Sequence, residues 1–154
     1  MGLDMYLRGD KFKHTEYKRL PDGELERTED GGIIPINVRM VDGFECEAER
    51  LKLGYWRKHA PLHKLIVDTF ADGVDECQVI HLSSEDCRLI AHKLRHKDFP
   101  KDVGGFFFGD EDWWQECCDA ANEDADLFER VADWNDLDSQ IDGYWHSVEY
   151  QASW

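Results

Sequence analysis

The segment from Asp112 to Trp134 places the strongest constraint on how this chain can fold. Its apolar residues recur at steps of three or four, which is the spacing that lines one face of an α-helix; they are Trp114, Cys117, Cys118, Ala121, Ala125, Phe128 and Ala132. Acidic residues lie on or near the opposite face, among them Asp112, Glu116, Asp119, Glu123, Asp126 and Asp133. The pattern predicts an amphipathic helix about 35 Å long. Its apolar face needs a second layer of structure to cover it.

Several stretches of the sequence predict β-strands that could form this second layer. Leu3, Met5 and Leu7 alternate with polar residues, as does the stretch 144–150, and alternation is typical of a half-buried strand. Residues 79–82 form a short apolar run that indicates a buried strand, and the β-branched stretch from Ile33 to Val41 predicts another.

Two further helices are expected between these strands. The apolar residues between Trp56 and Phe70 fall at helical spacing, and Pro61 fits the first turn of a helix from about Ala60 to Ala71, ended by Gly73. Ser83 or Ser84 is a good N-cap for the next helix. Residues 9–32 are expected to form a loop or a frayed hairpin, and 98–109 a loop. We find no repeat or linker, so the prediction is one α+β domain spanning residues 1–154, with three to four strands and three helices.

The acidic charge is confined to one part of the chain. The 34 Asp and Glu residues outnumber the 18 Lys and Arg, for a net charge of −16. Residues 1–100 carry a net −3, whereas residues 101–154 carry −13, with Lys101 and Arg130 their only basic residues. Direct binding to DNA, RNA or an anionic membrane would need clustered basic residues, so we expect basic protein partners instead.

The sequence also indicates the cellular compartment of the protein. No apolar run approaches the roughly 20 residues that span a bilayer, and the first residues lack a signal-peptide pattern, so a cytoplasmic location is expected. The odd number of cysteines favours reduced, mostly buried thiols; they are Cys46, Cys77, Cys87, Cys117 and Cys118.

Six short motifs follow one another along the chain. They are Met1–Leu7, Tyr55–Lys58 with His63, Asp72–Gly73 with Asp75 and Cys77, Ser84–Glu85, Gly105–Gly109 and Tyr150–Trp154. In order and spacing the chain resembles a family of small proteins common in phages and prophages. The stretch 9–54 is the least similar, and Pro61 departs from the family pattern. The resemblance implies a phage-encoded protein that acts inside a bacterial host and is dispensable to virion structure.

Motifs for metal, nucleotide or covalent chemistry have weak support. His59 and His63 are four residues apart, as metal ligands on a helix can be, but Pro61 lies between them and no glutamate follows His59. Cys77 and His81 could complete such a site, yet packed histidines and buried thiols are the more common outcome. No glycine-rich phosphate loop is present. We therefore predict no metal and no cofactor. The basic cluster Trp56–His59 could bind a small anion, but pairing with acids of the C-terminal half is the favoured interpretation.

Two hypotheses about function follow. The first is a non-enzymatic inhibitor whose acidic helix imitates nucleic acid and occupies a basic surface on a host defence complex, such as a CRISPR complex or a restriction enzyme. Trp113 or the Phe106–Phe108 loop would anchor the contact, and changing Asp119, Glu123 and Asp126 to lysine would abolish it. Solubility alone explains such acidity about equally well. The second hypothesis is a small enzyme or ligand-binding protein, with a site formed by Trp56, Arg57, His63, Asp72, Asp75 and Cys77.

Overall fold

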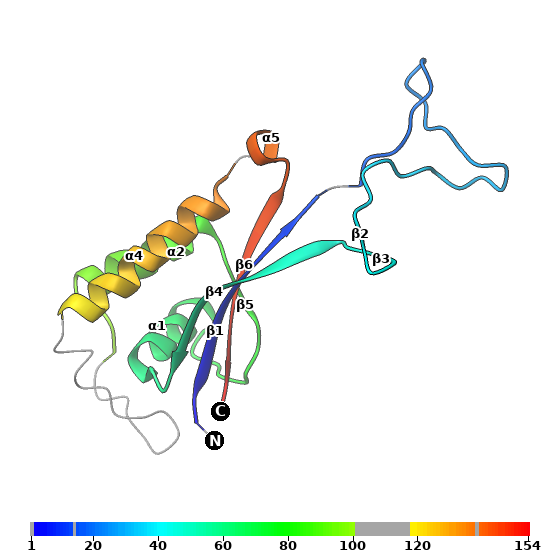
Figure 1. Ribbon diagram of the computed structural model, residues 1–154. Helices are drawn as coiled ribbons and strands as arrows, with labels where there is room; N and C mark the ends of the chain where they lie inside the picture. Colours follow the sequence, from blue (N-terminus) through cyan, green and yellow to red (C-terminus); the bar gives the residue numbers. More distant parts are fainter. Residues whose placement is uncertain (1, 14, 101–117, 138) are drawn as a thin grey trace.

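An antiparallel sheet with helices on one face forms the main body of the protein (Figure 1). The computed structural model describes residues 2–13, 15–100, 118–137 and 139–154. The sheet has the order β4-β1-β6-β5, formed by β1 (Asp4–Phe12), β4 (Ala48–Arg57), β5 (Ile80–Leu82) and β6 (Trp145–Ser153). The helices are α1 (Ala60–Phe70), α2 (Ser84–Arg95), α4 (Cys118–Asn135) and α5 (Ser139–Asp142). The predicted α+β class is confirmed.

The alternation of apolar and polar residues predicted near the N-terminus occurs on β1, and it determines which face of the sheet is buried. Met5 and Leu7 of β1 point into the core, together with Val148 and Tyr150 of the neighbouring β6. Asp4, Tyr6, Arg8 and Asp10 are only partly buried because they lie on the opposite face. Apolar residues of α1, α2 and α4 cover the inner face, so the long amphipathic helix finds the second layer it requires.

Local sequence signals set the ends of the first two helices. Pro61 lies in the first turn of α1, and Gly73 adopts a positive φ of 72° just after its end, which glycine tolerates. Ser83 caps α2 through a reciprocal capping box with Asp86. Both helices and strand β5 match their predictions closely.

Strand β4 is an element that the sequence pattern concealed. Trp56, which fits the helical spacing of residues 56–70, lies instead on this strand opposite Met5. The register between β1 and β4 shifts between Leu7 and Arg8, leaving Leu53 as an extra residue on β4. This bulge interrupts the alternation of apolar and polar residues, which is why the strand was not predicted.

Residues 15–47 form an arm that projects from the end of the sheet (Figure 1). The predicted strand from Ile33 to Val41 is wrong: only Met40–Val41 is a strand, β2, paired with β3 (Phe44–Glu45). The loop or frayed hairpin expected for residues 9–32 is wrong at its start, because residues 9–12 continue strand β1. The remainder makes only isolated bridges, from Arg19 to Leu25, from Arg27 to Ile33 and from Tyr17 to Pro35. Proline has no N–H to donate to a ladder, and residues 33–41 are exposed or half-buried, so these β-branched residues lack the packing that a strand requires.

Helix α4 lies beside α2 and approaches the sheet closely at one point (Figure 1). Gly9 of β1 permits this approach, because a Cβ atom there would lie 2.7 Å from the Trp134 ring. Among the described residues, no helix is both long and apolar enough to cross a membrane.

Candidate functional site

The acidic surface of α4 is the first candidate site, and the structure divides its residues into groups. Asp112, Trp113 and Glu116 lie outside the described residues, as does the Phe106–Phe108 loop. Asp119 and Glu123 lie on the first turns of α4 and are exposed. Neither of them forms an ion pair within the part of the chain that the structure describes.

The acids farther along α4 are neutralised by two arginines of α2. Arg95 contacts Asp126 at 2.5 Å and Glu129 at 2.8 Å. One heptad earlier, Arg88 contacts Asp133 at 3.2 Å and Asp136 at 2.7 Å. Hydrogen bonds to these carboxylates raise the pKa of both guanidinium groups. The predicted binding residues Asp126 and Asp133 are therefore already paired within the molecule.

Asp136 illustrates how this pairing stabilises the ionised carboxylate. A hydrogen bond from the Ser84 side chain and a second from Arg88 lower its pKa. Both donors belong to α2, so this carboxylate joins the start of α2 to the residue just after α4. The negative charge of Asp136 therefore stabilises the contact between α2 and α4.

Asp124 has a different role from the other acids of α4, because it is mostly buried. One carboxylate oxygen accepts a hydrogen bond from Trp56 Nε1 at 2.9 Å, and the other lies 3.2 Å from His59 Nε2. The predicted pairing of the basic cluster with the C-terminal half thus occurs through Trp56 and His59. Arg57 turns instead to Asp4, 4.0 Å away. Asp124 connects β4 and the start of α1 to α4.

A second hydrogen-bonded chain surrounds His63, which is 4% exposed. Its Nδ1 lies 2.7 Å from the Tyr150 hydroxyl and its Nε2 lies 2.8 Å from Asp75 Oδ2. Trp154 Nε1 donates to the other oxygen of Asp75 at 3.3 Å. Burial and the charge of Asp75 raise the pKa of Tyr150 well above its ordinary value, so the phenol keeps its proton. With a neutral imidazole, Tyr150 donates to Nδ1 and Nε2–H donates to Asp75.

The six residues of the predicted alternative pocket are only partly brought together. His63 and Asp75 are in direct contact. The Cys77 carbonyl accepts a hydrogen bond from Gln151, the residue that follows Tyr150 on β6. Trp56 belongs to the Asp124 contact, and Asp72 is exposed in the turn after α1. This hydrogen-bonded chain joins α1, the 72–79 loop and β6, and both nitrogens of its buried histidine are engaged. This arrangement is typical of a structural connection.

Replacing Tyr150 by phenylalanine tests this assignment. The change removes the partner of a buried imidazole nitrogen, so we expect the free energy of unfolding to fall by about 1–3 kcal/mol. Urea denaturation measures it. Tyr17→Phe, on the exposed arm, is the control and should change stability by less than about 0.5 kcal/mol. Equal effects of the two substitutions would show that the hydrogen bond contributes nothing.

The thiols and possible metal ligands show no reactive arrangement in the described ranges. Cys46, Cys77 and Cys87 are free thiols, but of these three only Cys87 is buried, so the expectation of mostly buried thiols is wrong for Cys46 and Cys77. Burial raises the pKa of Cys87 to about 12, which suppresses its nucleophilic thiolate. Cys117 lies outside the described residues. Among the described residues, no group of three His, Cys, Asp or Glu side chains is positioned to hold a metal ion.

The sequence reasoning missed the partners that define these networks. Arg88 and Arg95 are one heptad apart, which puts them on one face of α2, but nothing in the sequence indicates that this face meets α4. Tyr150 and Trp154 appeared only as members of a motif, without a partner. Comparison with known proteins adds no assignment: no family model, curated protein or solved structure matches this chain.

Proposed function

We propose that this chain is a phage-encoded, non-enzymatic inhibitor that binds a basic, nucleic-acid-binding surface of a host defence complex, such as a CRISPR complex or a restriction enzyme. The observation that supports this proposal is the pair of exposed carboxylates Asp119 and Glu123, which have no basic partner among the described residues. The phage setting rests on the resemblance of the sequence motifs.

Because the other acids of α4 are paired with arginines, the surface available to a partner is smaller than the whole helix. Asp126, Glu129, Asp133 and Asp136 already contact arginines of α2, so a partner gains less by approaching them. Asp119 and Glu123 are four residues apart and thus lie on one side of the helix, one turn apart. The repulsion between these two carboxylates favours an incoming Lys or Arg. The first turns of α4 are therefore the proposed contact, a shorter surface than the whole helix.

Electrostatic attraction would speed the association and make it sensitive to salt. Exposed charges steer an oppositely charged partner at low ionic strength, and the Debye length shrinks from about 10 Å at 0.1 M salt to about 3 Å at 1 M. Solubility is the competing explanation for the acidity, and it predicts no such partner.

A small enzyme or ligand-binding protein is the second candidate, because His63 and Asp75 form a direct contact. A histidine held by a carboxylate can act as a general base. Here the other ring nitrogen is occupied by Tyr150 and the imidazole is buried, which supports the inhibitor over the enzyme.

The experiment is capture of partners from a bacterial host lysate by the immobilised protein at 0.05, 0.15 and 1 M NaCl. We expect a basic nucleic-acid-binding protein at low salt, its release at high salt, and its displacement by added duplex DNA. Capture that persists at 1 M NaCl, or that DNA does not reduce, would contradict the proposal.

A further inference from the structure

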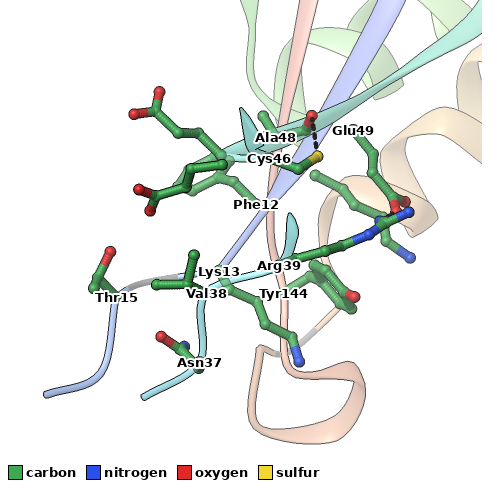
Figure 2. A pocket seen from close by; sticks show the side chains of 13 residues that line it. Phe12, Lys13, Thr15, Asn37, Val38, Arg39, Cys46, Ala48, Glu49 and Tyr144 are labelled. Carbon is green, nitrogen blue, oxygen red and sulfur yellow. Dashed lines mark hydrogen bonds and ion pairs between the residues drawn. The ribbon is translucent and has the colours of Figure 1, made fainter. Parts of the chain in front are cut away.

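A pocket of about 470 Å³ lies at the base of the arm (Figure 2). Its walls come from the end of β1, the segment 37–39 of the arm, the segment 45–49 that leads into β4, and Tyr144 just before β6. The volume falls within the range of sites for small organic molecules. The pocket shares no residue with α4 or with the network around His63.

Two lysines line this pocket together. The Nζ atoms of Lys11 and Lys13 lie 4.2 Å and 4.8 Å from the centre of the Tyr144 ring, so they are at most about 9 Å apart. Both residues lie on β1 or directly after it, and a spacing of two puts their side chains on one side of the strand. In the described part of the chain no carboxylate lies within ion-pair distance of either ammonium group. This is notable in a chain with 34 acidic residues.

The third cation of the pocket is already neutralised. Arg39 forms an ion pair with Glu49, and Figure 2 shows the two side chains reaching toward each other. The lysine pair is therefore the part of the wall that can attract a negative group. An ammonium over an aromatic ring keeps its N–H donors available to a second partner on the side away from the ring.

The remaining walls determine what else the ligand can carry. Phe12, Val38, Ala48 and the Tyr144 ring supply apolar contact, and Thr15 with Asn37 supplies neutral hydrogen-bonding groups. Glu45 and Glu47 also line the pocket and are exposed. Their carboxylates would repel a doubly charged phosphate more strongly than a singly charged carboxylate.

We propose that this pocket binds a small organic anion with an apolar or aromatic body, whose single carboxylate or phosphate is held by Lys11 and Lys13. The site is independent of the surface assigned under Proposed function, because it uses other elements and the opposite sign of charge. Failure of either assignment leaves the other intact.

The test uses probes that share a phenyl body and differ in the head group. Benzoate, phenyl phosphate and neutral benzyl alcohol are each titrated to 20 mM into the full chain while amide shifts are followed by NMR. We expect saturable shifts in segments 11–13, 37–39 and 45–49 with benzoate or phenyl phosphate, at millimolar affinity, and at least tenfold weaker binding of benzyl alcohol. The better of the two acids identifies the head group. Equal binding of benzyl alcohol, or no shift with either acid, would overturn the proposal.

Substitutions of charged residues in the pocket test whether the two lysines bind the anion. The double change Lys11→Met with Lys13→Met should weaken the better acid at least tenfold, whereas Lys52→Met with Lys64→Met, which removes the same charge elsewhere, should leave it within twofold. The change Glu45→Gln with Glu47→Gln should tighten phenyl phosphate by about threefold or more, a gain that a misfolded variant could not produce. Unchanged affinity in both pocket variants would refute the site.

Discussion

Replacing Phe128 by alanine is expected to lower the free energy of unfolding by about 3–5 kcal/mol. Phe128 is fully buried on the inner face of α4, and its ring stacks on Trp56 of β4 at a centroid distance of 5.9 Å. Truncation leaves a cavity between helix and sheet and removes support from Trp56, which also holds Asp124. Urea or thermal unfolding measures the change.

The matched control is Arg130→Ala, two residues farther along the same helix. Arg130 is exposed and takes part in none of the ion pairs described above, so its loss should change stability by less than about 0.5 kcal/mol. A loss below 1 kcal/mol for Phe128→Ala would mean that α4 does not pack on the sheet through this residue.

Reversing the charge of Asp119 and Glu123 to lysine is expected to lower affinity for the captured partner at least about 100-fold at 0.15 M salt, with the fold intact. Each change puts like charges against a basic surface, which costs more than the loss of an attraction. Asp126 is left unchanged because a lysine there would face Arg95 and disturb the contact between α2 and α4. Binding is measured by titration calorimetry, and the fold by circular dichroism and urea unfolding.

The control is Glu29→Lys with Glu76→Lys, which changes the net charge equally at exposed positions on the arm and in the 72–79 loop. It should lower affinity by less than about fivefold. If both double variants weaken binding equally, the interaction depends on total charge and the first turns of α4 are not the contact. If neither does, the acidity serves solubility.

Much of the fold could be predicted because its signals are local. The alternation of Leu3, Met5 and Leu7, the capping residue Ser83 and the helical spacing of residues 118–132 each act within a few positions of the chain. Strand β4 was hidden because the bulge at Leu53 interrupts its alternation. The predicted strand at 33–41 failed because β propensity cannot act without a partner strand and a layer to cover it.

The composition of the candidate sites, in contrast, depends mainly on the tertiary structure. From the sequence, the acids of residues 119–136 appear as one continuous negative surface. The structure separates Asp124, buried against Trp56 and His59, from the acids that meet Arg88 and Arg95, and both groups from Asp119 and Glu123. Likewise, His63 of the predicted cluster belongs to a hydrogen-bonded chain that includes Tyr150, 87 residues away in sequence.

By itself, the sequence determined the α+β class, the positions of three helices and the concentration of negative charge in the last third of the chain, because these depend on composition and on short-range periodicity. Only the tertiary structure decided which of those charges remain available. An ion pair between α2 and α4, or a lysine pair over Tyr144, depends on which faces of distant segments meet, and no local pattern specifies that.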